Sequence, residues 1–393
     1  MTPGARLPVA ATAVVGTALF LATVPLHRHW FDVGVYYGAI GDWVHGGRLY
    51  AYVRPGTPYG FTYPPFAALC MLPMAGLDWP GAVAVSIALN AAAGAVVLAL
   101  TAWPVIRREG WAPAYAGTLA TCLMALLEPV RDTVSLGQVN LVLLALVLTD
   151  AYALRTGRRT AGLGIGLAAA VKLTPALFIG YLLLTGRRRA AATATGTALG
   201  ATLLAAAVAP QASRTFWTAA VWDTNRVGSL AYVGNQSLRG LLARLDAPGA
   251  VWACAVAAVL AVWALRARRA HAAGDDRAGF ALTGIAACLV SPVTWVHHLV
   301  WLIPALTVTA DAALRSRPRR WPAAATASYV LLCSSLVWLW LDDTGGIGGF
   351  LGGNAYVWLS LALLVRLPVR HQEGSAATGA PRHPAGASPR ARR

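Results

Sequence analysis

Residues 81–104 read GAVAVSIALNAAAGAVVLALTAWP, a stretch without a single charged side chain. An α-helix of this length rises about 36 Å, which is enough to cross the hydrocarbon core of a bilayer. Similar apolar stretches recur along the whole chain, at 8–26, 112–128, 139–154, 190–209, 249–265, 278–291, 299–314, 321–341 and 352–367. The sequence therefore predicts an all-α polytopic integral membrane protein with about ten full spans.

Two further apolar segments are too short or too broken to span a bilayer. Residues 161–171 and 173–185 meet at Lys172 and Pro175, and we interpret 161–185 as a re-entrant or short helical hairpin. Residues 64–77 contain three prolines and are expected to be re-entrant or to lie in the membrane interface.

The composition excludes most other classes of protein. The chain has 393 residues, of which 57% are hydrophobic and 12% are charged, whereas soluble domains carry about 25% charged residues. The net charge of +17 would suggest nucleic-acid binding in a soluble protein. Here it is one-sided. With a cytoplasmic N-terminus, the cytoplasmic side holds 23 Arg and six acidic residues, and the opposite side holds eight Arg and nine acidic residues.

This asymmetry follows the positive-inside rule and predicts a multi-pass protein of the cell membrane with both termini in the cytoplasm. The excess charge then reports orientation and contact with membrane lipid, and no nucleic acid is expected as a partner. We expect a single membrane domain over 1–370 and a disordered basic cytoplasmic tail over 371–393. The loops at 27–80 and 210–248 fall on the extracytoplasmic side.

Polar residues gather in these loops and at the adjoining helix ends. This pattern favours a site for a substrate with a lipid tail in the bilayer and a polar head at its surface. Asp32 follows the first span directly and precedes an aromatic helix that contains Tyr36 and Tyr37. A carboxylate in such surroundings loses hydration, so its pKa should rise toward that of a general base. Helix N-capping by Asp32 explains its position equally well.

Two groups of residues are candidates for binding a phosphate. His297 and His298 can donate hydrogen bonds to a lipid-linked phosphate or a sugar hydroxyl, and helical geometry predicts that one of the two rings faces the site. The alternative is that they are interfacial histidines at the end of a span. Lys172 is the only lysine, lies between two apolar helices and needs an anionic partner. Its alternative is pairing with backbone carbonyls freed by Pro175.

Amides and aromatic rings complete the candidate site. The remaining candidates comprise one further cation for the donor phosphate, Arg239, and a set of sugar- or acceptor-binding residues, which are Tyr36, Tyr37, Tyr63, Gln138, Asn140, Asn235, Gln236 and Trp295. The amides can bind sugar hydroxyls, but the same side chains also cap helices.

An ordered set of short motifs links these residues to a known family. The motifs are DVGVYY at 32–37, GRLY at 47–50, FTYPPF at 61–66, GQVNL at 137–141, AAVKLTP at 169–175, NQSL at 235–238 and SPVTWVHH at 291–298. With them the chain resembles the polyprenol-phosphate-sugar-dependent glycosyltransferases of the GT-C superfamily, specifically the actinobacterial α-mannosyltransferases of glycosyltransferase family 87.

The resemblance implies a GT-C membrane fold, a site on the extracytoplasmic face, a polyprenyl-phosphate-mannose donor and inversion at the anomeric carbon. It also implies that Asp32 is the general base and that His297 or His298 contacts the donor. The expected acceptor is a cell-envelope glycolipid or lipoglycan. The expected reaction needs no cofactor and no metal, because Lys172 is a fixed cation. An arabinosyltransferase of the same fold, a lipid-linked-sugar transporter or flippase, and a structural membrane scaffold remain as alternatives.

Overall fold

The structure, a computed structural model, describes residues 3–24, 28–315 and 319–370. The tail predicted over 371–393 lies outside these residues. The described chain consists of helices and turns, with two isolated β-bridges in place of any sheet. The N-terminal half contains α1 (Pro3–Thr23), α2 (Phe31–Val44), α3 (Pro65–Met71), α4 (Trp79–Thr101), α5 (Trp103–Arg108), α6 (Pro113–Leu126), α7 (Glu128–Leu136), α8 (Asn140–Arg155), α9 (Leu163–Val171) and α10 (Leu177–Leu184).

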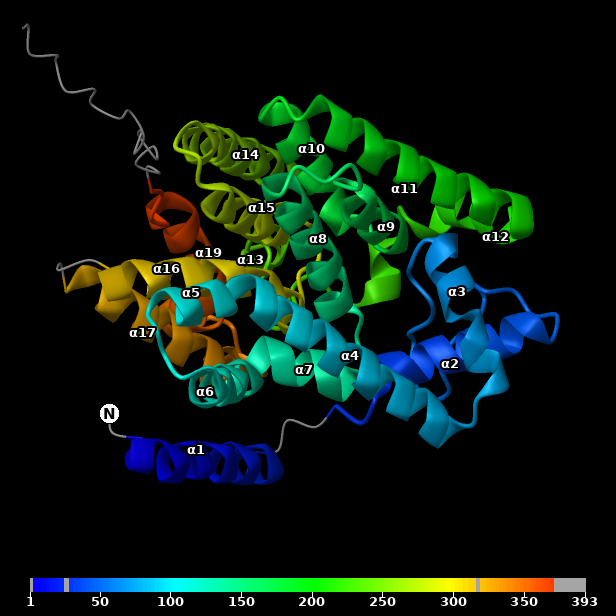
Figure 1. Cartoon of the computed structure of the whole chain (residues 1–393). Coiled ribbons are helices and arrows are strands. Elements are labelled where there is room, and N and C mark those ends of the chain that lie inside the picture. The colour runs from blue at the N-terminus through cyan, green and yellow to red at the C-terminus, as the bar shows by residue number, and fades with distance from the viewer. Residues whose placement is uncertain (1–2, 25–27, 316–318, 371–393) are drawn as a thin grey trace, which may run out of the picture.

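The C-terminal half continues the same pattern with long helices separated by short ones. It contains α11 (Arg188–Val208), α12 (Pro210–Thr215), α13 (Leu238–Arg244), α14 (Gly249–Ala272), α15 (Asp276–Val290), a 3₁₀ turn (Val296–Leu302), α16 (Ile303–Arg315), α17 (Arg320–Cys333), α18 (Gly346–Gly352) and α19 (Ala355–Arg366). In Figure 1, α2 and α3 lie at one end of the molecule, and α16, α17 and α19 lie toward the other.

Five of the described helical segments are long and apolar enough to cross a membrane. They are Gly4–Thr23, Trp79–Arg108, Arg188–Val208, Gly249–Ala272 and Val296–Arg315. Two bent pairs raise the number to seven if each pair forms one span: α7 with α8, at an angle of 118°, and α18 with α19, at 51°. The structure thus has an all-helical, membrane-type fold, with fewer full-length spans than the ten apolar stretches of the sequence predict.

The shorter helices show why apolar stretches and spans differ in number. The stretch 278–291 forms α15, whose residues from Ala278 to Leu289 are all buried, so this helix is surrounded by protein. The stretch 321–341 is interrupted after Cys333, where Ser335 adopts a left-handed conformation with φ of 55°. The segment 64–77 forms α3 and a 3₁₀ turn that together are too short to span. The predicted break at Lys172 separates α9 from α10.

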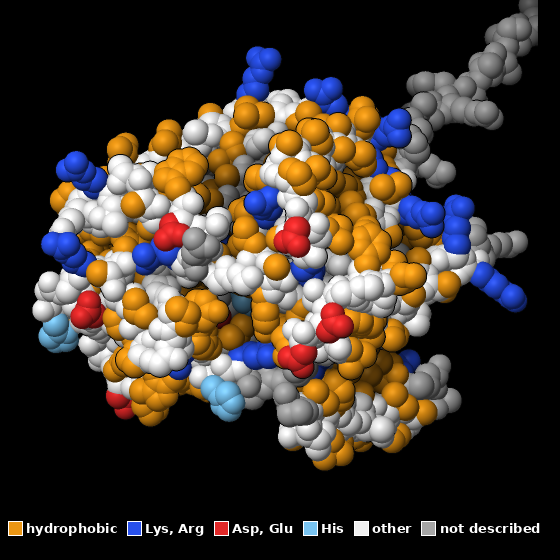
Figure 2. Space-filling model, turned by 180° about the vertical axis from the view of Figure 1, so that it is seen from behind, with side chains coloured by type: hydrophobic (Ala, Val, Ile, Leu, Met, Phe, Trp, Pro, Cys, Tyr) orange, Lys and Arg blue, Asp and Glu red, His pale blue; other side chains and the backbone are white. Residues whose placement is uncertain are grey.

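Much of the surface is apolar. Figure 2 shows hydrophobic side chains spread over the visible face, while most Lys and Arg side chains project from its edges. Large side chains such as Leu183, Leu203 and Leu339 are more than half exposed. An apolar exterior of this extent fits a lipid environment.

Candidate active site

One pocket of about 810 Å³ opens among segments that are far apart in the sequence. Pockets of this size hold drug-sized ligands and parts of larger ones. Its lining includes Asp32 from α2, Lys172 from the break after α9, and His297 and His298 from the 3₁₀ turn before α16. Both predicted extracytoplasmic loops and the ends of α7 and α15 contribute to the rest of the lining. The lining residues fall within 28–36, 59–64, 132–138, 172–177, 216–234 and 287–298, together with Trp338.

The turn that precedes Asp32 is strained and fastened in place. His29 and Trp30 both adopt left-handed backbone conformations, with φ of 50° and 54°, which non-glycine residues rarely adopt. The Trp30 amide donates a hydrogen bond to the carbonyl of Ser135 in α7 (2.9 Å). Trp30 is also the N-cap residue of α2, so Asp32 lies inside the first helical turn and is not the cap.

A glycine brings α2 close to the turn between α7 and α8. Gly137 has φ of +75°, and a Cβ there would lie 2.6 Å from the Cβ of Val33. Both its conformation and its contact therefore require glycine. This close approach sets the next residue, Gln138, beside Asp32.

Asp32 is the end of a chain of polar side chains. The Tyr36 hydroxyl donates to the Tyr63 hydroxyl (3.0 Å), and Tyr63 donates to Oε1 of Gln138 (2.8 Å). The Gln138 amide in turn forms a hydrogen bond with the Asp32 carboxylate. Burial raises the pKa of Asp32 to about 6, although the hydrogen bond from Gln138 and the charges of Lys172 and Arg54 oppose the rise. Asp32 is therefore a carboxylate with the proton affinity of a general base.

Lys172 is the C-cap residue of α9 and has an extended backbone conformation. Its Nζ donates to Oδ1 of Asn140 (3.0 Å), lies 2.7 Å from Nε2 of His298, and stands 5.3 Å from the centre of the Tyr63 ring. Within the described residues it has no carboxylate partner and no bond to a backbone carbonyl. The alternative that carbonyls freed by Pro175 hold Lys172 is thus wrong. Burial lowers the pKa of Lys172 to about 7, and the nearby charge of Asp32 opposes this fall, so the ammonium form is available to an anion in the pocket at and below neutral pH.

Both histidines line the pocket, where helical geometry predicts one. The two rings stand perpendicular, at 89°, in a 3₁₀ turn. His298 is held on both sides, since Nδ1 accepts the Trp295 amide (3.2 Å) and Nε2 faces Lys172. His297 is buried, and its Nε2 has no hydrogen-bond partner in the described chain. Buried polar atoms are usually paired, so this nitrogen is a candidate contact for a bound ligand.

Of the other predicted residues, Tyr36, Tyr63, Gln138 and Trp295 line the pocket. Arg239 does not, because its guanidinium stacks over the Trp252 ring at 5.5 Å. Tyr37 also lies outside the lining, since its hydroxyl donates to the carbonyl of Leu77 (3.0 Å).

Three predicted amides lie behind the pocket wall. Asn140 binds Lys172 and donates to the carbonyl of His297 (3.3 Å). Asn235 donates to the carbonyl of Pro292 (3.2 Å) and accepts the amide of Thr294 (2.9 Å). Gln236 donates to the carbonyls of Val233 and Gly353. All three are fully buried, so they hold the loops that carry Lys172 and the histidines.

Three arginines at the pocket escaped the sequence-based list. Arg28 and Arg226 line the pocket, and each has a buried guanidinium nitrogen without a partner in the described chain. Arg54 donates to the carbonyl of Phe31 and stacks on the Phe31 ring, beside Asp32. Their signal in the sequence is weak because arginine is common in loops throughout this chain. Within residues 3–24, 28–315 and 319–370 no three His, Cys, Asp or Glu side chains converge to hold a metal ion.

Comparison with known proteins gives a consistent result. Residues 61–292 match the model of glycosyltransferase family 87. The chain is 35% identical to a polyprenol-phosphate-mannose-dependent alpha-(1-2)-phosphatidylinositol mannoside mannosyltransferase of Mycolicibacterium smegmatis, over 91% of this chain and 87% of that protein. A protein of the same description from Mycobacterium tuberculosis is 35% identical over 85% and 83% of the two chains.

A second kind of relative is more distant. A polyprenol-phosphate-mannose-dependent alpha-(1-2)-phosphatidylinositol pentamannoside mannosyltransferase of Mycobacterium tuberculosis is 32% identical over 75% of this chain and 69% of its own length. No solved structure gives a significant match.

Proposed function

Because this chain belongs to glycosyltransferase family 87, we propose that it transfers a mannosyl residue from polyprenyl-phosphate-mannose to a cell-envelope glycolipid acceptor. The names of its relatives favour mannose over arabinose and favour a phosphatidylinositol mannoside as the acceptor. The observation that carries the proposal is the pocket, in which one cavity is lined by a carboxylate, Asp32, and by Lys172, which forms no ion pair in the described chain.

The proposed reaction is a single displacement with inversion. Asp32 accepts the proton of an acceptor hydroxyl, whose oxygen bonds to the anomeric carbon while the bond from that carbon to the phosphate oxygen breaks. The electron pair of the broken bond stays with polyprenyl phosphate, which gains one negative charge. Lys172 and the adjacent histidines offset this charge as it develops. Tyr36, Tyr63 and Trp295 form walls for the sugar and the lipid path.

The chemistry is tested with radiolabelled donor and purified protein in detergent. We expect transfer of mannose from polyprenyl-phosphate-mannose to phosphatidylinositol mannosides, with a new α-linkage from a β-linked donor. Transfer from polyprenyl-phosphate-arabinose alone would assign a different sugar. Failure to form any glycosidic bond with a panel of lipid acceptors would favour transport over transfer.

We also infer the orientation of the protein in the membrane. The arginine-rich loops support cytoplasmic termini in the cell membrane and a pocket on the extracytoplasmic face. We propose a GT-C fold over a single membrane domain, residues 1–370, in which the short helices α7 and α18 cross the bilayer together with their neighbours α8 and α19. Cysteine-labelling of the loops at 27–80 and 210–248 in intact cells tests the orientation: labelling only after the cells are broken would invert it.

The raised pKa of Asp32 predicts a pH profile. Asp32 acts as a base only when ionised, and its pKa is about 6. On the acidic side we expect kcat/KM to fall about tenfold per pH unit well below that pH. On the alkaline side it should fall again as Lys172 loses its proton, because burial lowers the pKa of Lys172 to about 7. A profile measured on the purified enzyme, with donor and acceptor stability checked separately, decides this. A midpoint near 4, the ordinary range of a carboxyl group, would show that the base is not Asp32 in this environment.

The hydrogen bond from Gln138 predicts a shift of the same profile. Gln138→Leu removes a bond to the charged form of Asp32, so the acidic limb should move up by about one pH unit. Tyr63→Phe should move it less and in the same direction, because it frees the Gln138 amide. Tyr37→Phe is the matched control. Tyr37 lies on α2, the helix that carries Asp32, but it does not line the pocket. Equal profiles in Gln138→Leu and the control would contradict the role of Gln138.

A further inference from the structure

A second cavity, of about 420 Å³, lies at the other end of the helices that build the pocket. Its lining comes from the last turns of α4 and α8, the first turns of α15, the first three turns of α16, and α5. The substrate pocket lies by contrast near the start of α8, the end of α15 and the turn before α16. On α15 the nearest lining residues of the two sites, Phe280 and Ala287, are about 10 Å apart along the helix axis. No described residue lines both.

The walls of this cavity are largely apolar. They include Leu100, Val105, Leu148, Phe280 and Val308. Trp103 and Tyr152 also line it, and both rings are partly exposed at the surface of the protein. An apolar cavity with aromatic rings at the surface suits an aliphatic chain that enters from the bilayer.

Three arginines line the same cavity. They are Arg107, Arg155 and Arg277, and in the part of the chain that the structure describes none has a hydrogen bond or an ion pair through its side chain. Arg277 is half-buried and Arg155 is exposed; the charges of Arg155 and Arg370 repel Arg277, and those of Asp311 and Asp275 attract it without forming an ion pair. A cation in such a place needs an anion.

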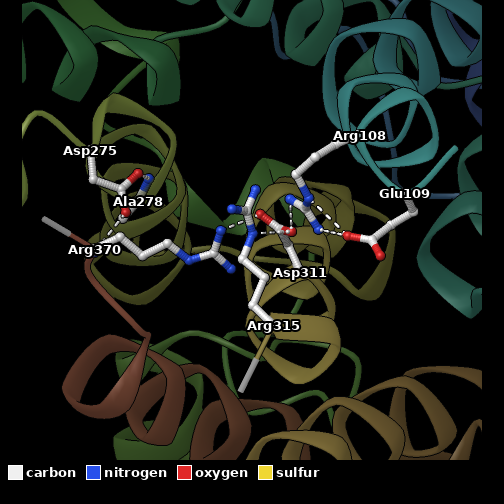
Figure 3. Close-up of polar contacts among 7 residues, drawn as sticks. All are labelled: Arg108, Glu109, Asp275, Ala278, Asp311, Arg315 and Arg370. Carbon is white, nitrogen blue, oxygen red and sulfur yellow. Dashed lines mark hydrogen bonds and ion pairs between the residues drawn. The ribbon is translucent and has the colours of Figure 1, made fainter. Parts of the chain in front are cut away.

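The acids of this cavity are already neutralised. Asp276 pairs with Arg187, which does not line the cavity. Asp311 pairs with three arginines, as Figure 3 shows: Arg108, Arg315 and Arg370 surround its carboxylate. Figure 3 also shows Arg108 shared with Glu109. Among the described residues, the unpaired charge of the cavity is therefore positive.

We propose that this cavity binds an anionic glycerophospholipid, with an acyl chain along the apolar walls and the phosphate on Arg155 and Arg277. Basic pockets between membrane helices are known to bind anionic headgroups. Because the arginines and the apolar walls line one cavity, a lipid fits it better than free phosphate does. This site is independent of mannosyl transfer, and direct binding measurements test it without reference to activity.

The test uses the full chain, purified in detergent and delipidated, with native mass spectrometry as the readout. Phosphatidylglycerol is titrated beside phosphatidylcholine with the same acyl chains. We expect phosphatidylglycerol to bind at least tenfold more tightly. Arg155→Gln/Arg277→Gln should weaken it at least tenfold. Arg188→Gln/Arg189→Gln is the matched control, because it removes the same charge next to Arg187 from residues that do not line the cavity, and it should bind within twofold of the unchanged protein.

Three outcomes would overturn the proposal. The first is equal loss in both double variants, which would indicate general attraction to basic loops. The second is unchanged binding in Arg155→Gln/Arg277→Gln. The third is binding of inorganic phosphate as tightly as the lipid, since the apolar walls would then contribute nothing to the affinity.

A crosslinking experiment on the unchanged chain covers the case in which the double variant fails to fold. Phosphatidylglycerol with a diazirine on its acyl chain should label peptides that contain 99–105 or 148–155. Labelling confined to other helices would place the lipid elsewhere and contradict the assignment.

Discussion

Asp32→Asn is expected to lower mannosyl transfer about a thousandfold, in the range that general-base catalysis contributes. The amide keeps the shape of the carboxylate but cannot accept the proton of the attacking hydroxyl. Donor binding should persist, because the phosphate contacts proposed for Lys172 and the histidines remain. The measurement is the initial rate of radiolabelled transfer at saturating donor, together with a donor-binding isotherm.

The matched control is Asp42→Asn. Asp42 lies on the same helix, is exposed and does not line the pocket, so its loss should leave the rate within about twofold. An Asp32→Asn protein that inserts normally, binds donor and keeps near-normal turnover would defeat the assignment of the base.

Lys172→Met is expected to lower transfer by a factor of about 10² to 10³, comparable with removal of one stabilising donor from an anionic transition state. Methionine retains the length and much of the volume of lysine but carries no charge. Because the departing phosphate gains charge as the bond breaks, kcat should fall more than the affinity for intact donor. Steady-state kinetics with varied donor separate the two effects.

Arg239→Met is the control for loss of a cation. The sequence predicts Arg239 as a further cation for the donor phosphate, yet its guanidinium packs on Trp252 outside the pocket. We expect its kinetic constants to change little. Equal losses of kcat in the two variants would mean that general charge, and not a positioned ammonium group, governs the reaction.

The helical fold and several residues that line the main pocket could be predicted because their signals are local. Apolar length indicates membrane helices, the pair of Lys172 and Pro175 indicates a broken helix, and Asp32 before an aromatic helix indicates a carboxylate in a poorly hydrated place. Each of these features is present in the structure. Family resemblance then supplied the order of motifs that joins distant segments to one site.

Other features depend on contacts between distant residues and could not be predicted. The interruption of 321–341 is an example, since Arg131 from α7 donates to the Cys333 carbonyl (3.0 Å) and the Ser335 hydroxyl (3.3 Å). No residue near Ser335 in the sequence indicates that Arg131 is its partner. Asn235 and Gln236 show the same limit, because an amide that binds a sugar and one that binds a buried carbonyl look alike in a sequence.

The first helix, α1, lies at the outside of the protein, and this affects where a label can be attached. None of the residues in its apolar window is buried, while the turn before Asp32 is fastened to α7 through Trp30 and Ser135. Contact with the membrane through α1 and the positioning of Asp32 through α7 thus fall to different parts of the chain. A fluorescent or affinity module added at the N-terminus would be attached to this outer helix, which packs on α6, and should leave the pocket undisturbed.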